Sequence, residues 1–134
     1  MVDIVCHSMG YAYALGMIQI LKTGAIPLGR FYCVAPENAC SGDINLNDFK
    51  EVWQYGTNEA PPEQGGDLVW EQDGVAPQCP IKNIGSRLSG TLNGRVYLPQ
   101  DFYPKTFLGC HSISNYGWIF NIKTDKDGYV KARK

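Results

Sequence analysis

A short apolar segment that runs into a tight turn and then into a helix-forming segment constrains this chain most. Residues Val2 to Cys6 are predicted to form a buried strand. The turn His7-Ser8-Met9 follows at once, and the small and apolar residues from Tyr11 to Lys22 favour a helix. Ser8 therefore stands at the tip of a strand-to-helix turn, a geometry that lifts a hydroxyl out of a sheet.

The residues on either side of this serine are small. Cys6 and Gly10 lie two positions before and after Ser8, where a turn this tight brings the backbone against the neighbouring strand and helix. The segment Cys6-His7-Ser8-Met9-Gly10 resembles the nucleophile elbow of the α/β-hydrolase family, and its centre is especially similar to lipases and esterases. Cys6 stands where that family more often has glycine. The alternative interpretation is a buried strand–helix corner with an incidental serine.

The position of the elbow limits how much of that family the resemblance covers. Several strands and helices precede the nucleophile strand in the family, whereas seven residues precede Ser8 here. The resemblance therefore implies the C-terminal half of an α/β-hydrolase fold, as a single domain over residues 1–134 with a mostly parallel sheet and crossover helices. The chain is then either a fragment of a longer reading frame or a reduced form of the fold.

The remaining pattern predicts further elements along the chain. Residues Arg30 to Ala35 are expected to form a second strand, parallel to the first because a helix joins them. Asn45 or Asn47 is expected to cap a helix that carries Phe49, Val52 and Trp53 on one face and ends at Gly56. A short third strand is predicted from Leu68 to Glu71.

The C-terminal third favours β-hairpins. The dipeptide Asn93-Gly94 is typical of a tight hairpin turn. A second hairpin is expected between the apolar run from Tyr116 to Ile122 and the residues Tyr129-Val130, with Asp127-Gly128 as its turn.

A serine hydroxyl needs a base to become a nucleophile, and histidine is the usual one. His7 is adjacent to Ser8, so its side chain is expected to diverge from the hydroxyl. His111 follows a strand-like run, and it comes after both the serine and the candidate acid, which is the chain order of the hydrolase family. We therefore expect His111 to be the base; the alternative is a loop or core histidine.

The acid that would orient His111 is expected to be Asp73, because Asp-Gly-Val-Ala-Pro follows a predicted strand and resembles the loop that carries the family's acid. The alternative is a turn-forming Asp-Gly pair. Glu37 is the competing acid and Asp43 a weaker third. The backbone N–H of Met9 is expected to donate to an oxyanion, and in the family a second donor comes from a loop before the elbow.

Composition excludes several other classes of function. Hydrophobic residues make up 44% and charged residues 19%, which fits a globular protein, and a net charge of −1 without a basic stripe argues against nucleic acid. The longest apolar run is broken by Gly16 and Gln19 and is too short to span a bilayer. Met1 stands directly before the first strand without a charged signal region, so a cytoplasmic location is the default expectation.

The cysteines and histidines argue against a metal. None of the five cysteines forms a Cys-x-x-Cys pair, and there are only two histidines, so we expect no metal and no cofactor. Cys40 and Cys79 fall in loops and are able to pair in an oxidising compartment.

These observations lead to an ester hydrolase that acts on a small-molecule ester or lipid through an acyl-enzyme, with Ser8, His111 and Asp73 as its triad. Two alternatives remain: a non-catalytic half-domain that acts as an interaction module, and acyl or thioester transfer on the same triad. Because the strand from Val2 to Cys6 lacks one neighbour of the family's sheet, we also expect it to pair with a second copy or with a separate N-terminal partner.

Overall fold

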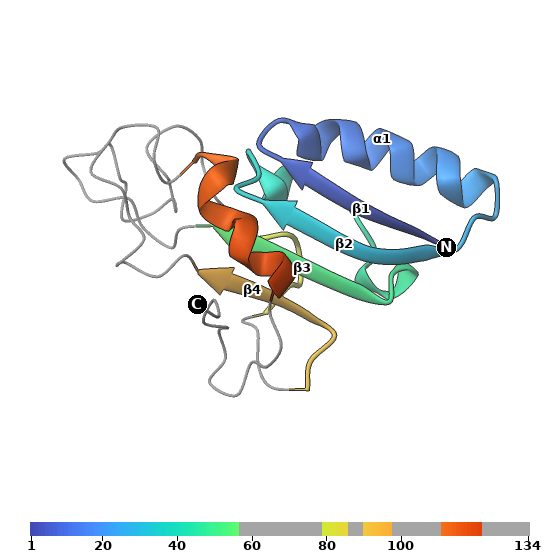
Figure 1. Ribbon diagram of the computed structural model, residues 1–134. Coiled ribbons are helices and arrows are strands. Elements are labelled where there is room, and N and C mark those ends of the chain that lie inside the picture. Colours follow the sequence, from blue (N-terminus) through green and yellow to red (C-terminus); the bar gives the residue numbers. More distant parts are fainter. Residues whose placement is uncertain (57–78, 86–89, 98–110, 122–134) are drawn as a thin grey trace.

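The computed structural model describes residues 1–56, 79–85, 90–97 and 111–121, which form a parallel sheet with helices packed on both faces (Figure 1). The strands are β1 (Val2–His7), β2 (Leu28–Val34), β3 (Glu51–Gly56) and β4 (Asn93–Tyr97), in this spatial order. Helix α1 (Gly10–Thr23) joins β1 to β2, and the 3-10 helices are η1 (Ala39–Ser41), η2 (Leu46–Asp48) and η5 (Ile113–Asn121). Every neighbouring pair of strands is parallel, so the fold is of the α/β class.

The first strand, helix and strand have the arrangement that the sequence predicts. Ile4 is the register partner of Phe31, and Cys6 that of Cys33, in a parallel pair of strands. Helix α1 ends at Gly24, whose N–H donates to the carbonyl of Ile20. The crossover through α1 therefore brings the carboxyl ends of β1 and β2 to the same edge of the sheet.

The prediction of a helix that carries Phe49, Val52 and Trp53 and ends at Gly56 is wrong. Asn45 does cap a helix, accepting the N–H of Asn47 on its side chain, but this helix is the short η2, and β3 follows it. Trp53 and Tyr55 pack on one face of the sheet while Val52 packs on the other. Apolar side chains on both faces of a central parallel strand also produce a helix-like spacing, and this explains the error.

Both hairpin predictions fail for the described residues. Asn93 and Gly94 lie inside β4, where they are the register partners of Val52 and Trp53 in a parallel pair, so they do not form a turn. The segment from Tyr116 to Asn121 is helical, within η5, and not a hairpin strand. The strand predicted from Leu68 to Glu71 lies outside the described residues.

The sheet has a hydrophobic core on each face. On one face, α1 packs over β1, β2 and β3. On the other face, η5 packs over the carboxyl-terminal parts of β2, β3 and β4 (Figure 1). The buried residues of the first core include Ile4, Tyr11, Ala14, Ile18, Phe31, Phe49, Val52 and Ile81, and those of the second include Val34, Trp53, Tyr55, Val96, Tyr116 and Ile119.

A disulfide and a buried amide hold the segment at residues 79–85 on the first face. Cys40 and Cys79, the pair that the sequence indicated, form a disulfide with a Cα–Cα distance of 5.4 Å. The side chain of Gln54, only 1% exposed, donates to the carbonyl of Cys79 (3.0 Å) and accepts the N–H of Ile81 (2.8 Å). Both the nitrogen and the oxygen of this buried amide therefore have a hydrogen-bond partner, as burial of a polar group requires.

The outer side of the β1–α1 unit exposes apolar residues. Strand β1 is at the edge of the described sheet, with β2 as its neighbour there. Val5 on β1 is 49% exposed, and Tyr13, Met17 and Ile20 on α1 are 79%, 47% and 73% exposed. Pairing of this edge with another chain stays a prediction. In the described part of the chain, no helix has the length and apolar character needed to cross a membrane.

Candidate functional site

Ser8 occupies a strained backbone position at the end of β1. Its φ is +55°, in the left-handed region that non-glycine residues rarely adopt. The N–H of Ser8 donates to Val34 O (3.1 Å), and its carbonyl accepts the N–H groups of Tyr11 (3.1 Å) and Glu37 (3.3 Å). Such a conformation costs about 1–3 kcal/mol and persists where the surrounding structure holds it in place. These hydrogen bonds to β2, α1 and the loop after β2 supply that restraint.

The small residues on either side of the serine lie close to one another. A Cβ atom added at Gly10 would lie 3.9 Å from Cys6 Cβ, so the two positions face one another across the turn. Cys6 itself is buried in the core beneath α1. The burial of Cys33 beside it, together with their mutual contact, raises the pKa of the Cys33 thiol, so this thiol stays protonated and unreactive.

The structure brings Ser8 and His111 together. The Nε2 atom of His111 lies 2.8 Å from Ser8 Oγ, within hydrogen-bond distance, although the residues are 103 positions apart in the chain. Both side chains are partly buried. If the serine hydroxyl donates this bond, Nε2 is unprotonated and the proton of a neutral imidazole sits on Nδ1. A serine that donates to an imidazole nitrogen is the arrangement required for base-assisted attack.

The structure gives different information on each of the three candidate acids. Asp73 lies outside the described residues, so its role stays a prediction. The backbone N–H of Glu37 contacts the elbow, but no hydrogen bond or ion pair of the described residues involves its carboxylate. Asp43 lies 4.0 Å from Lys82 Nζ in an exposed ion pair at a different part of the molecule, among the residues that line a polar cleft.

The backbone N–H of Met9, the expected oxyanion donor, is not used within the described part of the chain. The carbonyl of Met9 accepts the N–H of Ala12 at 3.0 Å, but no described acceptor receives its N–H. Met9 directly follows Ser8 and precedes the first residue of α1. An N–H at this position is able to donate to an oxygen that develops charge next to Ser8 Oγ.

His7 enters the site in a way that sequence reasoning missed. Its Nε2 lies 2.7 Å from the backbone carbonyl of His111, and because a carbonyl only accepts, the imidazole donates this bond. The two rings are tilted at 48° with centroids 5.0 Å apart. The side chain of His7 therefore reaches the residue that contacts the serine hydroxyl. A bond to a backbone carbonyl over 100 positions away leaves no signal in the sequence.

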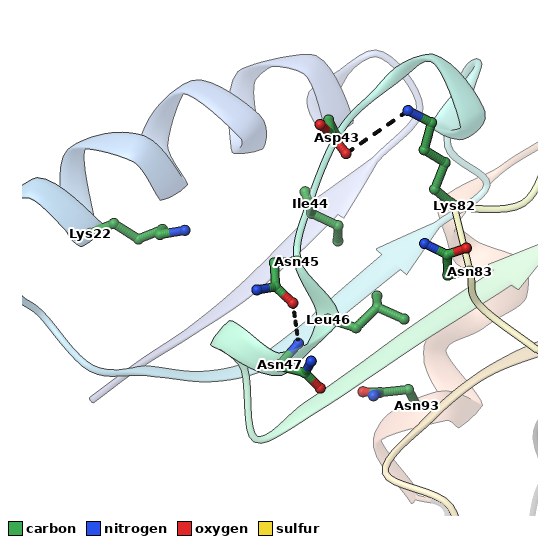
Figure 2. Close-up of a pocket in the computed structure, with 9 residues that line it drawn as sticks. All are labelled: Lys22, Asp43, Ile44, Asn45, Leu46, Asn47, Lys82, Asn83 and Asn93. Atoms are coloured by element: carbon green, nitrogen blue, oxygen red, sulfur yellow. Dashed lines mark hydrogen bonds and ion pairs between the residues drawn. The ribbon is translucent and has the colours of Figure 1, made fainter.

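A separate polar cleft of about 530 Å³ lies at the other end of α1 and beside η2 (Figure 2). Many of its polar groups already have partners. Lys82 pairs with Asp43, Lys22 pairs with Asp48, and Asn45 accepts from Asn47. Neither Ser8 nor His111 lines this cleft, so the cleft and the Ser8–His111 pair are separate features of the molecule. Its lining residues are Lys22, Asp43, Ile44, Asn45, Leu46, Asn47, Lys82, Asn83 and Asn93.

Comparison with protein-family models, with curated proteins and with solved structures found no significant match. Within the described ranges, no group of three histidine, cysteine or acidic side chains is placed to hold a metal ion. The observations that bear on function are therefore the residues at the strand-to-helix turn and the chemistry that these residues support.

Proposed function

We propose that this protein is a serine hydrolase of the α/β type that cleaves carboxylic esters through an acyl-enzyme. One observation carries the proposal: Ser8, with φ of +55° on a strand-to-helix turn, lies 2.8 Å from His111 Nε2. Strained backbone concentrates at functional sites, and a serine paired with an imidazole is a nucleophile with its base. The parallel sheet adds support because ligand sites collect at the carboxyl ends of such strands, where Ser8 lies.

The reaction follows from these positions. Ser8 Oγ attacks the ester carbonyl carbon while His111 Nε2 takes the hydroxyl proton, and the N–H of Met9 donates to the oxygen that becomes negative. As the tetrahedral intermediate collapses, the bond to the alkoxy group breaks and His111 returns the proton to the leaving alcohol. Water then repeats these steps on the acyl-serine and releases the acid. Asp73 is the proposed acceptor for the Nδ1 proton of His111.

The proposal also includes a compartment and a partner. The Cys40–Cys79 disulfide favours an oxidising compartment over the cytoplasm that the sequence suggested by default. The substrate is a small-molecule ester or lipid.

The proposed partner is a second copy of this chain, whose β1 pairs antiparallel with β1 about a two-fold axis. This edge of the sheet carries the exposed Val5 beside the exposed apolar residues of α1.

A fluorophosphonate probe, which needs no knowledge of the natural substrate, tests the hydrolase proposal. The wild-type chain should be labelled at Ser8, and Ser8→Ala should abolish labelling. His111→Ala should slow labelling by roughly 10³-fold or more because the hydroxyl loses its base. Ser112→Ala is the matched control, since its hydroxyl bonds to Ser114 and not to the pair, and it should label at the wild-type rate.

The same assay decides which carboxylate serves as the acid. Asp73→Asn should slow labelling strongly, and Glu37→Gln should leave it near the wild-type rate, since an acid-to-amide change at the partner of His111 favours the wrong imidazole tautomer. The reverse pattern would assign the role to Glu37. Equal labelling of wild type and His111→Ala would remove the base from the mechanism and with it the proposal.

A further inference from the structure

The side chain of His7 connects the nucleophile turn to the proposed base. His7 is the last residue of β1, and its register partner is Val34 of β2, so its backbone belongs to the sheet. From this position its Nε2–H donates to the carbonyl of His111 at 2.7 Å. Ser8, the next residue, contacts the imidazole of His111 at 2.8 Å. Two consecutive residues of the turn thus contact His111: His7 bonds to its backbone carbonyl, and Ser8 bonds to its imidazole ring.

We propose that His7 is a positioning residue for His111, a role that rests on the proposed function. Its hydrogen bond fixes the backbone of His111 relative to the rigid end of β1, and thereby places Nε2 against the serine hydroxyl. Among the described residues, the acceptor of His7 Nε2–H is the backbone carbonyl of His111, so this N–H is directed at the backbone of the proposed base and not at the serine hydroxyl.

The energetics of positioning make this contact important for rate. A misplacement of a catalytic group by about 1 Å can cost roughly 100-fold in rate. The Ser8 side of the pair is already fixed by its hydrogen bonds to Val34, Tyr11 and Glu37. His111 stands at the start of the described segment that leads into η5, so a bond from the sheet to its own carbonyl acts directly at the residue that must be placed.

Two substitutions at His7 separate the hydrogen bond from the ring. His7→Phe keeps an aromatic ring against His111 but removes the donor. His7→Gln removes the ring but keeps an N–H donor at a similar distance along the side chain. Gln19→Ala, at an exposed position on α1, is the control for a general effect of a substitution in this part of the molecule. Circular dichroism and thermal melting of each variant establish that it is folded before its rates are compared.

The readouts are the rate of fluorophosphonate labelling and the steady-state hydrolysis of p-nitrophenyl acetate. His7→Phe should lower kcat and the labelling rate by roughly 10- to 100-fold, with KM changed by less than about twofold, because positioning affects the chemical step. His7→Gln should recover most of the loss, and Gln19→Ala should match the wild type. Wild-type rates in His7→Phe, or equal losses in His7→Phe and His7→Gln, would overturn the role.

Nitrogen-15 spectra of the imidazoles keep this test separate from the hydrolase proposal. Absence of Ser8 labelling in the wild type would contradict the hydrolase proposal. The hydrogen bond from His7 to His111 is then tested separately, by the tautomer of the His7 imidazole. A proton on Nε2 of His7, together with altered His111 ring shifts in His7→Phe but not in Gln19→Ala, supports the link. A proton on Nδ1 with an unprotonated Nε2 overturns it, because Nε2 would then have nothing to donate.

Discussion

The two members of the proposed catalytic pair are held by different kinds of structure. Ser8 belongs to the β1–α1–β2 unit, and hydrogen bonds to Tyr11, Val34 and Glu37 restrain it from within 30 residues of chain. His111 is held by contacts with residues more than 100 positions earlier, namely His7 and Ser8. Ser8 is thus placed by a local unit, and His111 by contacts between distant parts of the chain.

The two faces of the sheet repeat this difference. One face is covered by α1, which follows β1 directly, and the other by η5, which joins the sheet from a distant part of the chain. His111 lies just before η5, so its position depends on the second core more than the position of Ser8 does. Damage to that face should therefore reduce activity before it unfolds the molecule, and this expectation is open to test.

The largest expected effect comes from a matched pair of core substitutions. Ile18 on α1 and Ile119 on η5 are each 3% exposed, one in each core. Ile18→Ala and Ile119→Ala should each lower the free energy of unfolding by about 2–5 kcal/mol, as measured by urea denaturation. At a temperature where both variants are folded, Ile119→Ala alone should also slow labelling of Ser8, because only its core supports the segment of His111.

Equal slowing of labelling by the two variants would contradict this difference between the cores, since it would mean that the placement of His111 depends on both cores alike. Slowing of labelling by Ile18→Ala alone would mean that the placement of His111 depends on the core beneath α1 instead.

A smaller effect is expected on the outer side of the local unit. Val5→Lys places a charge on the exposed edge strand, a substitution that natural edge strands use against pairing. If a second copy pairs with β1, this change should weaken self-association by roughly tenfold, about 1.4 kcal/mol, in light scattering over a concentration series. A wild-type chain that stays monomeric at all concentrations would show that the edge does not pair with a copy.

The smallest effect concerns Tyr11, whose hydroxyl donates to Ala39 O at 3.2 Å beneath α1. Burial, reinforced by Cys33, Cys6 and Asp43, raises the pKa of Tyr11 above its ordinary value. A raised folded-state pKa gives stability that is full below the unfolded pKa of about 10 and is lost as the pH rises above it. Tyr11→Phe should cost about 1 kcal/mol at neutral pH for the lost hydrogen bond.

Denaturant titration from neutral pH to about pH 11 tests this, because the wild type should lose stability over the alkaline part of the range and Tyr11→Phe should lose less. Parallel alkaline losses in the two proteins would show that other groups cause them.

Much of the local unit could be predicted from the sequence. The apolar strand, the turn with a serine at its tip and the following helix are set by neighbouring residues, through sterics and hydrophobic pattern. The parallel pairing of β1 with β2 follows from the helix between them. The bridge between Cys40 and Cys79 was also indicated, since both fall in loops.

Tertiary structure alone decided the rest. Phe49, Val52 and Trp53 have the spacing of a helix face, yet β3 is a strand because the sheet offers it a buried position with hydrogen-bonding neighbours on both sides. Asn93-Gly94 has the chemistry of a turn, yet it lies in β4, where both residues pair in parallel with residues of β3. The bond from His7 to the carbonyl of His111 depends on closing about 100 residues of chain. Local preferences are worth fractions of a kcal/mol per residue, so burial and long-range pairing override them, and sequence reasoning succeeds where neighbours alone determine the structure.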